Sequence, residues 1–150
     1  MQRPQLRRTA LPIAVIAAAL LIPTTAAATT PPGVILGTAD ADTLVGTDRA
    51  DIIFGFAGDD LIYGGRGADR IFAGKGDDRV RGGPGPDTIR GGPGEDRIAG
   101  GPGNDLILVA GDGEGDHVWC GDGRFDVVIA DPIDVVADDC EFILLRDTES

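Results

Sequence analysis

Residues 55–108 read GFAGDDLIY, GGRGADRIF, AGKGDDRVR, GGPGPDTIR, GGPGEDRIA and GGPGNDLIL, six blocks of nine residues without an insertion or deletion. When the six blocks are aligned, three positions, or columns, hold the same type of residue in every block. The fourth position is always Gly: Gly58, Gly67, Gly76, Gly85, Gly94 and Gly103. The sixth is always Asp: Asp60, Asp69, Asp78, Asp87, Asp96 and Asp105. The eighth is a branched aliphatic: Ile62, Ile71, Val80, Ile89, Ile98 and Ile107. A fixed short period of this kind indicates a solenoid, in which blocks bury their apolar side chains only against neighbouring blocks.

Each column has a physical reason. Glycines at positions one, two and four allow positive φ and a tight turn whose carbonyl groups point inward. An Asp at position six adds a carboxylate to this ring of oxygens, and an all-oxygen cage is what a hard cation such as Ca²⁺ prefers. Positions seven to nine form a strand of three residues whose middle side chain faces the core. Each block is therefore predicted to be a turn followed by a very short strand.

The blocks resemble the G-G-x-G-x-D-x-U-x repeat of the RTX (repeats-in-toxin) family of calcium-binding proteins. The resemblance implies an all-β fold, a right-handed parallel β-roll in which block n stacks on block n+2 and several Ca²⁺ ions lie between stacked loops. It also implies that the calcium ligands are the sixth-position carboxylates, Asp60, Asp69, Asp78, Asp87, Asp96 and Asp105. The acidic or amide residues at position five suit the turn itself, because Asp and Asn tolerate left-handed backbone; they are Asp59, Asp77, Glu95 and Asn104.

The charge balance favours a cation-dependent fold. The formal net charge is −12, and three of the 13 basic residues, Arg3, Arg7 and Arg8, precede every acidic residue. In the rest of the chain the acidic residues outnumber the basic ones, and their carboxylates repel one another until cations bind. A Gly-rich, disordered chain is therefore expected without calcium. Binding of roughly four to six Ca²⁺, at the near-millimolar levels typical of extracellular modules, would then supply folding free energy. The same balance disfavours partnership with nucleic acid or with an anionic membrane.

Residues 1–28 have the features of an export signal. A basic start is followed by an apolar run from Ala10 to Ile22 and by small residues at Ala26–Ala28, which predicts cleavage after Ala28 and a secreted or cell-surface protein. An uncleaved membrane anchor is the alternative, although the run is short for a membrane span and insertion is not expected after signal removal. Many RTX proteins leave the cell through an uncleaved C-terminal signal, so this chain departs from that pattern. Residues 29–36 form a short lead-in.

Two further blocks precede the glycine-rich array. GTADADTLV (37–45) and GTDRADIIF (46–54) keep Asp42 and Asp51 at position six but lack the second and fourth glycines. They extend the predicted roll to eight repeats, residues 37–108. Because terminal repeats of solenoids are usually atypical, we expect these loops to bind calcium weakly or not at all.

Residues 109–150 are predicted to be degenerate repeats and a short β cap. GDGEGDHVW (111–119) and GDGRFDVVI (121–129) keep the Asp and the aliphatic residue, and the tail 131–145 alternates Asp with aliphatics, which favours strands that close the open end of the roll. Cys120 and Cys140 are the only cysteines, and in an exported chain they are expected to form a disulfide worth roughly 3 kcal/mol. A zinc site is the weaker alternative, because only His117 could add a soft ligand.

The chemistry of an enzyme is hard to assemble from this sequence. Ser150, His117 and Lys75 are the only residues of their types, so a nucleophile with a base is barely constructible. A carboxylate mechanism is the remaining enzymatic alternative. In the RTX family catalysis belongs to separate domains, and we therefore expect no enzyme activity.

The main hypothesis is an exported calcium-binding protein whose Gly/Asp loops couple binding to folding. The alternative is a calcium-dependent module that binds a surface glycan or a partner protein. Arg79, Arg81 and Arg97 are expected to face outward together on one sheet, where they could hold an anionic glycan or simply keep a flat sheet soluble. The other sheet is expected to present Phe54, Phe72, Leu106 and Leu108 beside Arg70 and Arg90.

Overall fold

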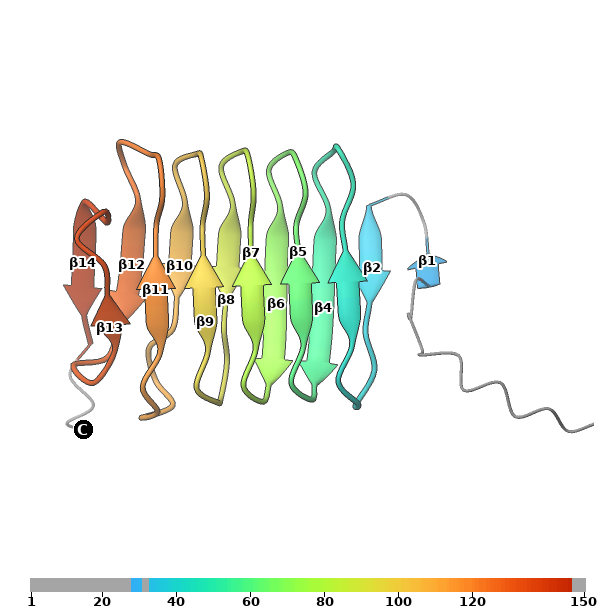
Figure 1. Ribbon diagram of the computed structural model, residues 1–150, viewed down its shortest axis with the longest axis horizontal. Helices are drawn as coiled ribbons and strands as arrows, with labels where there is room; N and C mark the ends of the chain where they lie inside the picture. Colours follow the sequence, from blue (N-terminus) through green and yellow to red (C-terminus); the bar gives the residue numbers. More distant parts are fainter. Residues whose placement is uncertain (1–27, 31–32, 147–150) are drawn as a thin grey trace, which may run out of the picture.

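The computed structural model describes residues 28–30 and 33–146, and these residues form strands and turns with no helix. The strands make two sheets that face each other across a narrow core (Figure 1). The eight-stranded sheet contains β1 (Ala28–Thr30), β2 (Val34–Leu36), β4 (Ile52–Ala57), β6 (Arg70–Lys75), β8 (Thr88–Arg90), β10 (Leu106–Leu108), β12 (Val127–Ala130) and β14 (Phe142–Leu145), in that order. The six-stranded sheet contains β3 (Thr43–Val45), β5 (Leu61–Tyr63), β7 (Arg79–Arg81), β9 (Arg97–Ala99), β11 (His117–Trp119) and β13 (Val135–Val136).

Successive strands alternate between the two sheets, so each block stacks on the block two places later. Ile62 of β5 pairs with Val80 of β7, and Ile71 of β6 pairs with Ile89 of β8, in parallel register. In Figure 1 the front strands run upward and the rear strands downward while the chain advances from right to left. The roll is therefore right-handed. The predicted all-β parallel β-roll is confirmed.

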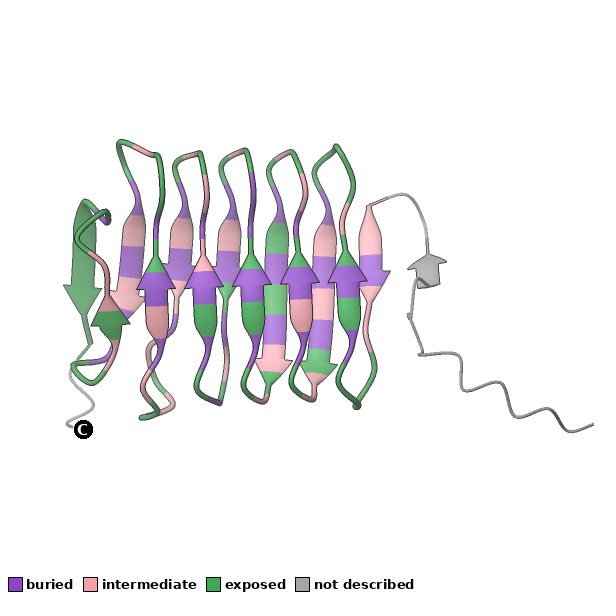
Figure 2. Ribbon diagram, viewed as in Figure 1, coloured by how far each residue is buried: buried purple, intermediate pink, exposed green. Residues whose placement is uncertain are grey.

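The core is one aliphatic side chain wide. Each three-residue strand of the array buries its middle residue and leaves its flanking residues at least partly accessible, as the single purple band on the arrows of β5, β7 and β9 in Figure 2 shows. The branched aliphatic column is accordingly almost fully buried: Ile53, Ile62, Ile71, Val80, Ile89, Ile98 and Ile107. Such a thin core gives each turn little hydrophobic stabilisation, so the loops must contribute as well.

The stacked turns approach so closely that glycine is required. Gly85 has φ +140°, and a Cβ there would collide with the carbonyl oxygen of Gly67 in the turn below. Gly67 in its turn has φ +124°, and a Cβ would lie 2.5 Å from the carbonyl carbon of Arg49. The glycine column thus serves both the left-handed backbone and the spacing of the stack.

The first described strand extends the eight-stranded sheet. β1 pairs with β2 in the antiparallel sense. The predicted signal peptide lies outside the described residues, apart from Ala28 at the start of β1. None of the described residues forms a helix that is long and apolar enough to cross a membrane.

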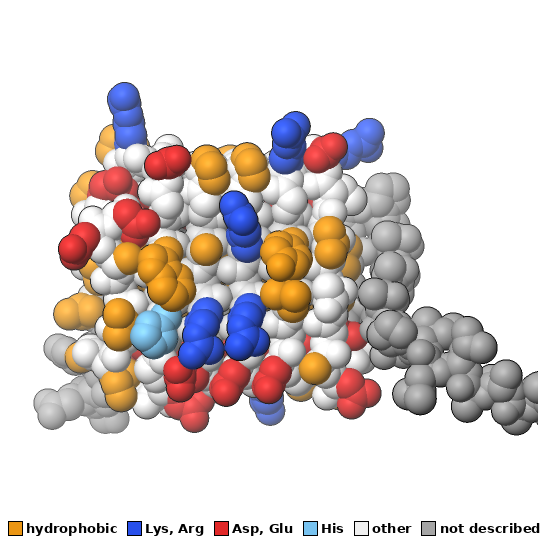
Figure 3. Space-filling model, in the orientation of Figure 1, with side chains coloured by type: hydrophobic (Ala, Val, Ile, Leu, Met, Phe, Trp, Pro, Cys, Tyr) orange, Lys and Arg blue, Asp and Glu red, His pale blue; other side chains and the backbone are white. Residues whose placement is uncertain are grey.

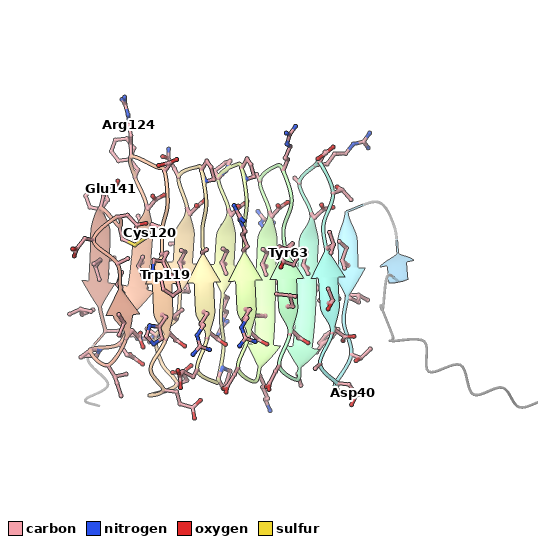
Figure 4. The ribbon with its side chains drawn as sticks, in the orientation of Figure 1. Asp40, Tyr63, Trp119, Cys120, Arg124 and Glu141 are labelled. Atoms are coloured by element: carbon pink, nitrogen blue, oxygen red, sulfur yellow. A yellow bond between two sulfur atoms is a disulfide. The ribbon has the colours of Figure 1, made fainter. Side chains whose placement is uncertain are left out.

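The predicted C-terminal strands are present. They lengthen the two sheets, and they do not cover the end of the core, because Phe142, Ile143, Leu144 and Leu145 of β14 are all exposed. The predicted disulfide joins Cys120 to Cys140 beside these strands (Figure 4).

Candidate calcium sites

The sixth-position aspartates lie where each turn meets its strand, and their side chains point inward. All six carboxylates of the array are at most 2% exposed. The turns of alternate blocks gather at opposite edges of the roll, so the aspartates form two files. One file contains Asp42, Asp60, Asp78, Asp96 and Asp116, and the other contains Asp51, Asp69, Asp87, Asp105 and Asp126.

Each file is tied together by a repeated hydrogen bond. The backbone N–H of an aspartate donates to Oδ1 of the aspartate in the next stacked turn, as from Asp60 to Asp78 at 2.8 Å and from Asp69 to Asp87 at 2.8 Å. This bond fixes the carboxylate plane and uses one of its two oxygens. The hydrogen bond between stacked turns therefore fixes both the position and the orientation of these side chains.

The second oxygen has no hydrogen-bond partner among the described residues. It is buried in every turn of the array, where the orphaned atoms are Oδ2 of Asp60, Asp69, Asp78, Asp87, Asp96 and Asp105. A buried carboxylate oxygen without a donor is costly, more so than a neutral group. A recurring cost of this size at equivalent positions indicates a binding site for a cation.

Burial also makes the metal-free carboxylates hard to ionise. Loss of solvation raises the pKa of Asp87 to about 7, and the neighbouring Asp105 and Asp69 carboxylates raise it further. The same loss, with the Asp78, Asp116 and Asp112 charges, raises the pKa of Asp96 to about 8. Burial raises the pKa of Asp78 and of Asp105 to about 6, and raises that of Asp60 and Asp69 as well. A cation bound between the turns would lower these pKa values, because it stabilises the ionised carboxylates.

Proline at position three leaves a backbone carbonyl of the preceding stacked turn without a hydrogen-bond donor. Arg66 N–H donates to the carbonyl of Thr47 in the preceding stacked turn at 2.9 Å. In later blocks Pro84, Pro93 and Pro102 stand at the equivalent position and have no N–H to donate. Within the described part of the chain the equivalent carbonyls, those of Gly65, Gly74 and Gly83, accept no backbone hydrogen bond.

The fourth-position carbonyls are free too. Those of Gly58, Gly67, Gly76, Gly85 and Gly94 accept no backbone hydrogen bond from any described residue. Each turn therefore offers hard oxygen ligands from its backbone as well as from its aspartate. This donor set, with no nitrogen or sulfur, fits Ca²⁺ rather than a transition metal.

The first-position glycine keeps space open beside the orphaned oxygen. A Cβ at Gly64 would lie 2.7 Å from Asp69 Oδ2, and a Cβ at Gly82 or Gly91 would collide with Oδ2 of the aspartate in its own block. Ala73 is the one exception in the array, and its buried methyl group stands at the position equivalent to Gly64 and Gly82.

The first two blocks differ from the array at Oδ2 of their aspartates, which accepts hydrogen bonds, although Oδ1 of Asp51 is buried without a partner among the described residues. Thr38 donates its N–H and its hydroxyl to Asp42 Oδ2 at 2.6 and 2.8 Å, and Thr47 does the same to Asp51 Oδ2 at 2.6 and 2.8 Å. The oxygen that is orphaned in the glycine-rich turns is here neutralised by protein donors. The geometry gives a physical reason to expect weak or no calcium binding in these loops.

Two aspartates beyond the array repeat the site geometry and were not among the expected ligands. Asp116 and Asp126 are fully buried and have an orphaned Oδ2, and their Oδ1 atoms accept from Asp96 and Asp105 at 2.8 and 2.7 Å. The inserted residues Val109 and Ala110 are absorbed because both N–H groups donate to the carbonyl of Ile129. The signal was present in the sequence, since each Asp is five residues after a glycine that restarts the period.

The fifth-position residues lie on the outer rim of the turns and remain exposed. Asp59 Oδ1 accepts from Asp77 N–H at 3.0 Å, and Asp77 Oδ1 accepts from Glu95 N–H at 3.0 Å. These side chains serve the turns, as expected from their composition. Asn104 plays the same part at the other edge, where it accepts from Arg124 N–H at 3.2 Å.

The cysteines form no zinc site. Cys120 and Cys140 are joined by an S–S bond of 2.03 Å, and no free cysteine remains in the described part of the chain. Asp139 lies beside them and accepts from the N–H groups of Cys120 and Gly121 at 3.2 and 3.0 Å. Its carboxylate therefore anchors the turn next to the disulfide.

A parallel β-roll with buried acidic turns of this kind defines the class of calcium-binding solenoids. Comparison with known families gives the same answer: the RTX calcium-binding nonapeptide repeat (4 copies) matches residues 36–71 and again residues 72–107. Residues 36–107 therefore belong to the RTX calcium-binding nonapeptide-repeat family. The comparisons with curated proteins and with solved structures found no match. The repeats of this family are a structural calcium-binding module and not a catalytic one.

Proposed function

We propose that this is an exported protein that folds when Ca²⁺ occupies its stacked turns and that works without catalysis. The observation that carries the proposal is the file of buried, orphaned carboxylate oxygens at equivalent positions of successive turns. The ligands are Asp60, Asp69, Asp78, Asp87, Asp96 and Asp105, and the geometry supports Asp116 and Asp126 as two more.

Folding and binding are coupled by electrostatics. Without a cation the roll would hold two files of carboxylates in a thin apolar core, where their mutual repulsion and desolvation oppose folding. Ca²⁺ supplies the missing partners, so its binding free energy becomes folding free energy. Export suits this design because near-millimolar calcium is an extracellular condition.

Far-UV circular dichroism of the chain during a calcium titration tests the proposal. We expect a cooperative gain of β signal with Ca²⁺ in the range of roughly 0.1–1 mM and none with Mg²⁺ at the same concentration, because Mg²⁺ demands a stricter octahedral cage. A chain that is equally folded in chelator would contradict the coupling. Recovery of the chain from the culture medium, with its N-terminus at Thr29, tests export.

A second candidate function is a calcium-dependent module for a surface glycan or a partner protein. The specific observation in its favour is a set of exposed arginines on the six-stranded sheet, of which two have no acidic partner within ion-pair distance among the described residues.

A further inference from the structure

The exposed face of the six-stranded sheet concentrates positive charge in a strongly acidic protein. Arg79 of β7 pairs in register with Arg97 of β9, and Arg81 lies two residues from Arg79 on the same face. The three side chains are exposed. Figure 3 shows basic side chains at the centre of this face, above a row of acidic side chains along the lower edge.

These arginines are left almost without protein partners. The only ion pair among the described residues joins Arg97 to Glu95 at 3.4 Å, between two exposed side chains, which is a weak interaction. Like charges on directly opposed strand positions destabilise a sheet. An anion lying across β7 and β9 would remove this repulsion, and the planar guanidinium groups match a carboxylate in geometry.

Two exposed aromatic rings flank the charges. Tyr63 of β5 pairs with Arg81, and Trp119 of β11 pairs with Ala99, so one row across the sheet reads Tyr63, Arg81, Ala99, Trp119. Tyr63 is 39% and Trp119 46% exposed, and both labels lie over the front sheet in Figure 4. Three strand spacings separate the rings, about 14 Å. The small side chain of Ala99 lies between Arg81 and Trp119 in this row.

We propose that this face binds an extended carboxylated polysaccharide. Sugar rings would pack on Tyr63 and Trp119, as the apolar face of a pyranose packs on an aromatic ring, and carboxylates between them would pair with Arg79, Arg81 and Arg97. The inference rests on the proposed function in one respect, because the face exists only once the roll has folded.

The charge pattern favours a sparsely charged polymer over a nucleic acid. Asp59, Asp77 and Glu95 border the arginines along the lower edge and would repel a chain that carries a phosphate at every unit. A polysaccharide with one carboxylate for every one or two sugars can place its charges on the arginines and its neutral groups elsewhere. A net charge of −12 adds to this discrimination.

The test titrates the calcium-loaded chain with a hyaluronan decasaccharide, which has one carboxylate per two sugars, by calorimetry and by tryptophan emission. Trp119 is the only tryptophan of the chain, so its emission reports directly on this face. We expect saturable binding with a change in emission, no binding of a neutral dextran, and weaker binding of a ten-residue oligothymidylate. Absent binding, equal dextran binding, or tighter oligothymidylate binding would overturn the proposal.

A matched pair of variants locates the site. Arg79→Gln/Arg81→Gln removes two charges from this face, and Arg70→Gln/Arg90→Gln removes two from the opposite sheet. We expect affinity for hyaluronan to fall about tenfold or more in the first variant and less than about twofold in the second. An equal fall in both would show that only overall charge matters, and would reject the site.

The calcium-dependent β signal of each variant separates this inference from the proposed function. A normal calcium transition with lost hyaluronan binding confirms the face as the site, whereas a lost transition in the unsubstituted chain would reject the calcium proposal instead. If Arg79→Gln/Arg81→Gln did not fold, Arg81→Gln alone would decide, with an expected fall of about threefold or more in affinity.

Discussion

The first two blocks and the glycine-rich array use the same aspartate column in different ways. Asp42 and Asp87 are both buried ahead of a three-residue strand. Asp42 receives two hydrogen bonds from Thr38, whereas Asp87 leaves one oxygen without any donor among the described residues. One residue at position two, Thr or Gly, separates the two cases.

This difference indicates what the orphaned oxygens are for. Thr38 and Thr47 show that a turn can supply protein donors to the Oδ2 oxygen that is orphaned in the array. The array lacks such donors in every turn and has free carbonyls instead. Under the proposed function, the array therefore needs a cation at Oδ2, whereas the first two blocks supply threonine donors to the same oxygen.

Replacement of one aspartate in each region should show the largest contrast. Asp87→Asn preserves shape and the acceptor for Asp69 N–H but removes charge from the orphaned oxygen. We expect the calcium midpoint of folding to rise about fivefold or more, because calcium affinity follows ligand charge. Asp42→Asn is the matched control and should change the midpoint less than about twofold. Equal effects from both variants would show that the two regions do not differ in calcium binding.

Acidification should replace part of the effect of calcium, because burial raises the pKa of aspartates in the stacked turns. Folding raises the pKa of Asp87 and Asp96 from 3.8 to about 7 and about 8, so the folded metal-free chain binds more protons than the unfolded chain. Folding in chelator is therefore favoured fully below about pH 4, and this contribution is lost as pH rises through about 6 to 8. Circular dichroism in chelator should show more β signal at pH 4 than at pH 8. An unchanged or weaker signal at pH 4 would contradict the role of buried carboxylate repulsion.

Removal of the Thr47 hydroxyl should moderately lower the stability that the first two blocks contribute. Thr47→Val keeps the side-chain shape but deletes the hydroxyl that donates to Asp51 Oδ2. We expect a loss of about 1–2 kcal/mol in the calcium-loaded protein, measured as a thermal midpoint lower by several degrees. Thr43→Val, on the exposed surface of β3, is the control. A similar shift in the control would mean that the hydroxyl bond contributes nothing specific.

The smallest expected effect comes from Ala73→Gly, which makes the one exceptional block of the array like the others at its first position. Ala73→Gly restores the first-position glycine that the other five blocks have, and should open space beside Asp78 Oδ2. Since glycine also loses more backbone entropy on folding, we expect the calcium midpoint to fall by only about twofold. A higher midpoint would show that the entropy cost outweighs the gain at the site.

Much of the site was predictable because the repeat is regular. Positive φ of the glycines and burial of the sixth-position aspartates are found at the turns where the repeat predicts them, whereas the role of Asp60 to Asp105 as calcium ligands stays a prediction. Asp116 and Asp126 were missed, because the inserted Val109 and Ala110 and Cys120 break the period that pointed to the others. In the structure a shared carbonyl acceptor at Ile129 absorbs the two inserted residues without disturbing the hydrogen-bond file.

The sequence by itself determined the solenoid, its two-block stacking and its aspartate column, because a nine-residue period fixes turn and strand at every step. Only the tertiary structure decided which carboxylate oxygen already has a backbone donor, since Oδ1 accepts from the N–H of a turn 18 residues away. It also placed Tyr63 and Trp119 on the face where the sequence already predicts Arg79, Arg81 and Arg97. Such neighbours across strands are set by register, which brings residues far apart in the chain within about 5 Å of one another.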